Sequence, residues 1–222
     1  MKKISLLVIF SIITVFLFAQ TDGKATAEPL SDDQLALQTA NSLARYGYKA
    51  QSGSALIGAA EIFARIRTQP LGVQAVRSQQ SGSGTADTPE FTPAALIADA
   101  RKIIGNDKTM RAWADEVQKS INTRTRGAVG GPKSAADIIY AGQTITYEVA
   151  IRGLEATWIT LYGNGTSDLD LFVYDSSGRL IVGDDSYSDD AAVWVAGLLP
   201  QVIRIVVANV GNRANRFNLY ID

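Results

Sequence analysis

The residues best able to do chemistry are concentrated between positions 163 and 190, in GNGTSDLDLFVYDSSGRLIVGDDSYSDD. This stretch holds seven aspartates and one basic residue. Six of the aspartates form two groups on either side of a predicted hairpin: Asp168, Asp170, Asp184, Asp185, Asp189 and Asp190. Calcium prefers carboxylate and carbonyl oxygens, so these six could bind Ca2+ if the two groups meet at one edge of a sheet. The alternative is a solvated acidic edge that keeps the protein soluble and discourages strand addition.

The same carboxylates are the remaining candidates for catalysis, because the chain has no histidine and no cysteine. Their absence excludes Ser-His-Asp and Cys-His catalysis, disulfides and most transition-metal sites. Carboxylate-dependent hydrolysis needs two carboxyls in different environments, and the Asp168 and Asp170 pair shows no sign of that asymmetry. We therefore predict a protein that is not an enzyme, with a carboxylate-dependent hydrolase, its site between two domains, as the alternative.

Aromatic residues supply the other candidate contacts. Tyr187 lies between two serines in the acidic segment, and it is the aromatic residue expected to be exposed for ligand contact. Trp158 and Trp194 fit the core of a β-sandwich better, since buried tryptophan is common there.

Short alternating segments surround these residues. Leu169, Leu171 and Val173 alternate with polar or aromatic neighbours, which predicts a strand with one buried face. Asp175 to Gly178 reads as a turn, because Asp caps the backbone and Gly accepts a positive φ. Seven strands are predicted, at 144–151, 157–162, 168–174, 180–182, 192–195, 202–208 and 216–221. This spacing indicates an all-β sandwich over residues 138–222.

The first half of the chain has helical periodicity and predicts an all-α domain over residues 30–121. Ser31 and the Thr92-Pro93 pair are N-terminal helix signals, and Gly47 is an expected stop. The glycine- and serine-containing segment 68–91 predicts a flexible loop, and residues 122–137 predict a linker to the sandwich. The expected architecture is thus multidomain, with helical hairpins or a bundle followed by a β-sandwich.

The N-terminus predicts export. Lys2 and Lys3 precede an apolar run that ends near Ala19, which is typical of a signal peptide covering residues 1–19, with cleavage after Ala27 as the alternative. No later segment predicts a stable membrane span, so we expect a periplasmic, extracellular or cell-surface protein. The formal net charge of −1 lacks the basic footprint of nucleic-acid binding.

Residues 140–222 resemble the bacterial pre-peptidase C-terminal (PPC) domain family. The resemblance rests on Asp-Leu-Asp-Leu-Phe-Val-Tyr-Asp at 168–175 and on the Val-x-Asn-x-Gly turn at 207–211. It implies a jelly-roll-like sandwich that binds a polysaccharide, a protein partner or the cell surface, in some relatives with structural calcium. No protease domain precedes the module here, so a removable secretion tail explains it poorly.

The helical half weakly resembles tetratricopeptide-like hairpins. Residues 55–57 and 95–97 share the sequence Ala-Leu-Ile, which suggests a duplicated hairpin, although an ordinary four-helix bundle explains the match equally well. Together these patterns predict an exported binding or accessory protein with helices for protein contacts. A purely structural subunit with no ligand is a further alternative.

Overall fold

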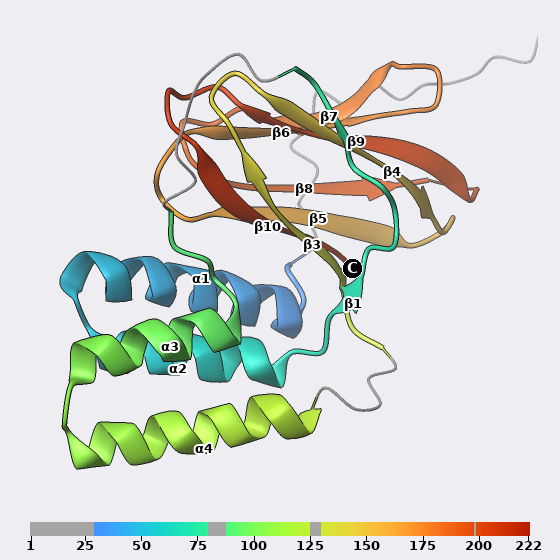
Figure 1. Ribbon diagram of the computed structural model, residues 1–222. Coiled ribbons are helices and arrows are strands. Elements are labelled where there is room, and N and C mark those ends of the chain that lie inside the picture. Colours follow the sequence, from blue (N-terminus) through green and yellow to red (C-terminus); the bar gives the residue numbers. More distant parts are fainter. Residues whose placement is uncertain (1–28, 80–87, 125–129, 198) are drawn as a thin grey trace, which may run out of the picture.

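A computed structural model describes residues 29–79, 88–124, 130–197 and 199–222 of the chain. These residues form three layers: four helices, a helix-facing sheet and an outer sheet (Figure 1). The predicted signal segment and both cleavage positions lie outside the described residues. Within the described part, no helix is both long and apolar enough to cross a membrane.

The helices are α1 (Asp32–Ala50), α2 (Gly53–Arg65), α3 (Pro93–Ile104) and α4 (Lys108–Arg124). The expected caps are present: Ser31 and Thr92 accept hydrogen bonds from the backbone N–H groups of Gln34 and Ala95. The predicted stop at Gly47 was wrong, since α1 continues to Ala50. A Cβ at Gly47 would lie 2.5 Å from Leu56 Cδ2, so the glycine lets α2 approach closely instead of ending the helix.

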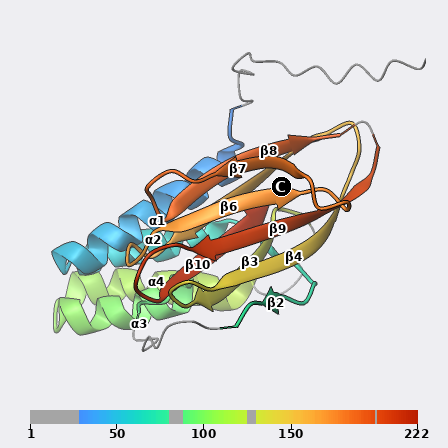
Figure 2. The ribbon, with the colours of Figure 1, turned by 90° about the horizontal axis from the view of Figure 1, so that it is seen from above.

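The helix-facing sheet has the strand order β1-β3-β10-β5-β8, and the outer sheet has the order β2-β4-β9-β6-β7. The pairing is antiparallel except between β1 and β3. Figure 2 shows the sheets from the side opposite the helices. The strand bounds are β1 (Gln69–Pro70), β2 (Val76–Arg77), β3 (Lys133–Ile139), β4 (Thr144–Ile151), β5 (Ala156–Gly163), β6 (Leu169–Tyr174), β7 (Leu180–Asp184), β8 (Asp190–Ala196), β9 (Gln201–Asn209) and β10 (Asn215–Ile221).

All seven predicted strands are present, and the prediction of helices followed by two packed sheets is confirmed, while the jelly-roll-like arrangement stays a prediction. Three strands were missed. Segment 68–91, expected as a loop, contributes β1 and β2, which extend one edge of each sheet, while residues 80–87 lie outside the described part. Segment 122–137, expected as a linker, contains the end of α4 and most of β3. Because β3 pairs along its whole length with β10, this pairing forms a strand that local propensity does not indicate.

The apolar residues form two clusters. One fills the space between the sheets and includes Leu169, Leu171 and Val173, as the alternation predicted. The other lies among the helices, and it includes Tyr162 and Tyr220 from the helix-facing sheet. The centroids of those two rings are 6.1 Å apart, and because both residues belong to this cluster, the helices pack on side chains that the sheet supplies.

The Val-x-Asn-x-Gly turn that follows β9 is held by the side chain of Asn209, which is 1% exposed. Its amide group donates to the carbonyl oxygens of Ile139 (3.1 Å) and Arg213 (2.7 Å). Its side-chain oxygen accepts from Ser167 Oγ (2.7 Å) and Gly211 N (3.1 Å). Asn209 therefore ties β3, the β5–β6 loop and the β9–β10 turn together.

Candidate functional site

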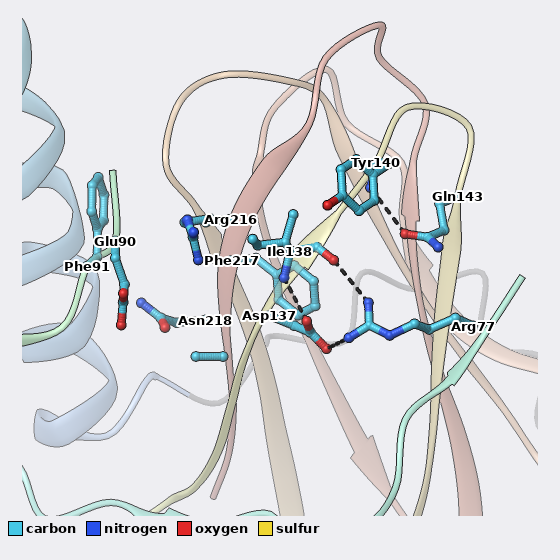
Figure 3. Close-up of a pocket in the computed structure, with 11 residues that line it drawn as sticks. Arg77, Glu90, Phe91, Asp137, Ile138, Tyr140, Gln143, Arg216, Phe217 and Asn218 are labelled. Atoms are coloured by element: carbon cyan, nitrogen blue, oxygen red, sulfur yellow. Dashed lines mark hydrogen bonds and ion pairs between the residues drawn. The ribbon is translucent and has the colours of Figure 1, made fainter. Parts of the chain in front are cut away.

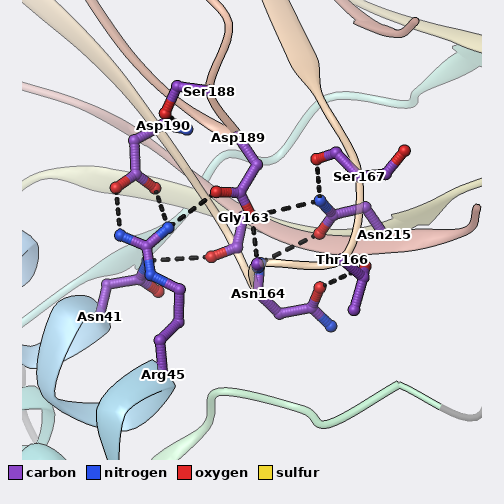
Figure 4. A network of polar contacts seen from close by, with 11 residues as sticks. Asn41, Arg45, Gly163, Asn164, Thr166, Ser167, Ser188, Asp189, Asp190 and Asn215 are labelled. Carbon is purple, nitrogen blue, oxygen red and sulfur yellow. Dashed lines mark hydrogen bonds and ion pairs between the residues drawn. The ribbon is translucent and has the colours of Figure 1, made fainter. Parts of the chain in front are cut away.

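The six predicted aspartates separate into two groups in space, and the first group is held by a helix. Arg45 of α1 donates through Nη1 to Asp189 Oδ1 (2.8 Å) and Asp190 Oδ1 (2.9 Å), and through Nη2 to Asp190 Oδ2 (Figure 4). All three side chains are partly buried. These two carboxylates thus fasten the helical layer to the start of β8, a role that the sequence did not reveal.

A hydrogen-bond network surrounds this ion pair. Asp189 Oδ2 accepts from Gly165 N and from Asn215 Nδ2 (3.3 Å). Asn215 also accepts from Asn164 N (3.0 Å), and Asn41 of α1 donates to the carbonyl of Gly163 (3.0 Å). Figure 4 shows how these residues converge from α1, the β5–β6 loop, β8 and β10. The network therefore fixes the position of the loop next to the other aspartates.

Burial raises the pKa of Asp190 even though the Arg45 guanidinium lies beside it and acts in the opposite direction. Burial alone would lower the pKa of Arg45, but the hydrogen bond and charge of Asp190 raise it overall. Because a guanidinium keeps its proton throughout the physiological pH range, Arg45 stays positively charged in this pair. A cation at Asp189 and Asp190 would have to compete with this arginine.

The second group comprises Asp168, Asp170, Asp184 and Asp185. Asp170 is 9% exposed, and burial raises its pKa, as do the nearby charges of Asp168, Asp185 and Asp184. Asp184 Oδ1 and Oδ2 accept from Ser186 N (3.2 Å) and Ala192 N (3.1 Å). Among the described residues no group of three or more His, Cys, Asp or Glu side chains is arranged to hold a metal ion. Calcium binding therefore stays a prediction.

Replacing Asp170 by asparagine should raise Tm at neutral pH, because the ionised carboxylate is buried beside like charges. A carboxyl whose pKa is higher in the folded state destabilises the fold when ionised, and this penalty disappears as pH falls through that pKa. The difference in Tm between D170N and the wild type should shrink on acidification. Melting curves across this pH range provide the test, with exposed Asp185→Asn as the weaker control. A lower Tm for D170N at neutral pH would contradict the account.

Tyr187 lies at the tip of the sandwich, and its prediction as an exposed residue is confirmed by its exposure of 97%. It borders a shallow hollow of about 280 Å³ between the β5–β6 and β7–β8 loops, which is lined by Gly165, Thr166, Ser167, Asp168, Tyr187, Ser188 and Asp189. Asp168 Oδ1 is buried there without a hydrogen-bond partner among the described residues. The hollow thus combines an exposed aromatic ring with the hydroxyl oxygens of Thr166 and Ser167 and the carboxyl group of Asp168, of which Oδ1 is buried.

Trp158 and Trp194 lie directly opposite each other on β5 and β8. Both are half-buried, and neither belongs to an apolar cluster. The prediction that they fill the core is corrected. Ile159 and Val193 point into the core between the two sheets, so the neighbouring Trp158 and Trp194 point to the opposite face of their sheet, the face that is turned toward the helices.

A larger pocket of about 540 Å³ lies between the segment that precedes α3 and the strands β2, β3 and β10 (Figure 3). Its carboxyl groups are Glu90 and Asp137, and Asp137 is paired with Arg77. Arg77 also donates to the carbonyl of Ile138 (3.0 Å). Among the described lining residues, Glu90 is therefore the one carboxyl group without an ion pair. No second unpaired carboxyl lies in this lining to act with Glu90 as general acid and general base.

No family model matches the chain, and no curated protein matches it. A solved structure of the pre-peptidase C-terminal domain of a collagenase from Bacillus anthracis is similar to it, with 10% identity and a TM-score of 0.35 over 42% of this chain and 91% of that one. A periplasmic inhibitor of g-type lysozyme, PliG from Aeromonas hydrophila, has 13% identity and a TM-score of 0.30 over 41% of this chain and 84% of that one. Membership of the PPC family and the tetratricopeptide-like resemblance both stay predictions.

Proposed function

We propose that the protein is an exported, non-catalytic binding protein that contacts an envelope or extracellular polysaccharide through the tip around Tyr187. The observation that carries this proposal is the almost fully exposed ring of Tyr187 at a hollow that is also lined by Thr166, Ser167 and Asp168. An exposed ring can stack on the apolar face of a sugar, while carboxylate and hydroxyl oxygens hydrogen-bond its hydroxyls.

The helices have two roles in this proposal. Arg45 and Asn41 of α1 brace the loops of the tip through the network described above. On the solvent side, Leu35 and Tyr46 of α1 are exposed apolar residues, and Tyr46 borders a shallow hollow with Leu43. This face is the part of the helical layer that we assign to protein contacts.

Substitution of Tyr187 tests the tip. We expect Tyr187→Ala to weaken retention on the polysaccharide that the wild type binds by about tenfold, the value expected for losing one buried aromatic contact. The assay is co-sedimentation with insoluble peptidoglycan, chitin and cellulose. Tyr46→Ala is the matched control and should bind like the wild type. If no polysaccharide retains the wild type, or if Y187A is retained equally well, the proposed ligand class is wrong.

Calcium is a separate part of the proposal and concerns Asp168, Asp170, Asp184 and Asp185. A cation that binds the folded state stabilises it by mass action, so millimolar calcium should raise Tm relative to chelator, and D170N should lose most of that rise. An unchanged wild-type Tm would end the calcium proposal and leave the Tyr187 experiment unaffected.

A further inference from the structure

The pocket between the segment that precedes α3 and the paired strands β3 and β10 has a floor whose polar side chains come from β10. Arg216 and Asn218 lie on β10, opposite Ile138 and Ala136 of β3, and alternate residues of β10 face the core. The register therefore turns Arg216 and Asn218 to the same side as Tyr220, toward the helices. Tyr220 is covered by the helical cluster, whereas Arg216 and Asn218 lie where that cover ends.

The described residues hold the Arg216 side chain in place, but none of them neutralises its positive charge. Its Nε donates to the carbonyl of Thr88 (2.9 Å), and no described carboxylate forms an ion pair with it. The nearby Arg77 differs, because Asp137 and the Ile138 carbonyl engage its guanidinium. The hydrogen bond to Thr88 uses Nε of Arg216. The two terminal nitrogens of the guanidinium can then bind a carboxylate through two hydrogen bonds.

The opposite wall carries the complementary charge. Glu90 is exposed, and it makes no ion pair with a described residue. Figure 3 shows Glu90 and Phe91 on one side of Arg216 and Asn218, and Ile138 and Asp137 on the other. The Phe91 ring stacks on the ring of Tyr48, with the two ring centroids 5.7 Å apart.

Neutral polar groups complete the lining. The side chain of Asn218 and the hydroxyl of Tyr140 make no hydrogen bond with described residues, whereas Gln143 is already bonded to Tyr140 N (3.2 Å) and to the carbonyl of Ser78 (3.3 Å). The cavity of about 540 Å³ is within the range of small-molecule sites. It thus contains an available cation, an available carboxylate, two hydrogen-bonding groups and apolar walls.

We propose that this pocket binds a small zwitterion of the amino-acid class, with its carboxylate on Arg216, its ammonium group on Glu90 and its side chain against Phe91 and Ile138. The site is separate from the tip around Tyr187, and it does not depend on that tip binding a polysaccharide.

The test is an NMR titration of the protein with a panel of free amino acids. Leucine is compared with its two single-charge analogues, isopentylamine and 4-methylpentanoate. We expect at least one amino acid to bind and to shift backbone signals of residues 136–138 and 216–218, with both analogues weaker. Arg216→Gln should weaken binding by about tenfold, the loss expected for a charge-assisted pair. Arg213→Gln is the matched control, since Arg213 is exposed, lies three residues earlier and does not line the pocket.

Two further variants keep the test decisive if R216Q unfolds, which circular dichroism would show. Glu90→Gln should remove the preference for leucine over 4-methylpentanoate, and Asn218→Ala should weaken leucine binding several-fold. The proposal is overturned if no amino acid binds the wild type, if all the variants bind like the wild type, or if the acid and the amine bind as tightly as leucine.

Discussion

Replacing Asn209 by alanine is expected to lower the free energy of unfolding by about 2–3 kcal/mol, because a buried group left without a partner costs about 1–3 kcal/mol and a partly buried one costs less. The variant loses the buried hydrogen bond to the carbonyl of Ile139 and the partly buried ones to the carbonyl of Arg213 and the N–H of Gly211. Urea denaturation followed by circular dichroism measures the change. The loss should appear as a lower midpoint with an unchanged slope.

Two variants show whether the hydrogen bonds cause this loss. Asn209→Asp keeps the acceptor for Gly211 but removes both donors, so it should also destabilise strongly. Asn212→Ala, in the same turn but exposed, should change the free energy of unfolding by less than about 0.5 kcal/mol. Equal stability of N209A and N212A would show that the Asn209 side chain does not hold the turn.

Replacing Arg45 by alanine is the second change with a large expected effect. We expect a loss of about 2–3 kcal/mol, between the small value of an exposed ion pair and the value for breaking a fully buried one. The variant leaves Asp189 and Asp190 partly buried, close together and without their cation. Urea denaturation is again the measurement. Arg65→Ala is the matched control, because its pair with Glu61 is an exposed pair along one helix.

A double-mutant comparison tests the cause. In a D189N/D190N background, R45A should cost much less than in the wild type, since the residues in contact are energetically coupled. If R45A costs the same in both backgrounds, Arg45 stabilises the protein through packing rather than through the two aspartates. A loss no larger than that of R65A would contradict the proposed role of Arg45.

The predictions that the structure confirms rest on local signals. Most of the seven strands were found because their apolar residues alternate with a period of two, and the starts of α1 and α3 were found because Ser31 and Thr92 are strong N-caps. The turn at Asp175 is of the same kind. Ser177 Oγ and the N–H groups of Arg179 and Ser177 bond to its carboxylate, and they lower its pKa to about 2.

The missed elements depend on partners far away in the chain. β1 and β2 have two residues each, too few for any periodicity, and they exist because β3 and β4 offer edges to pair with. β3 begins in a segment of small and polar residues, and its pairing with β10 joins residues more than seventy positions apart. Gly47 within α1 has the same origin. Leu56 of α2 packs so close to position 47 that there is no room for a Cβ, so the glycine serves this contact and does not end the helix.

The sequence by itself determined that this protein has a helical half and a β half, that it cannot use histidine or cysteine chemistry, and that its acidic residues gather around Tyr187. These conclusions follow from composition and short-range periodicity. Only the tertiary structure decided that Asp189 and Asp190 are bound by an arginine 144 and 145 residues earlier, and that Arg216 and Glu90 line one pocket. The charge environment of a carboxylate depends on which side chains folding brings within a few ångströms, and spacing along the chain does not contain that information.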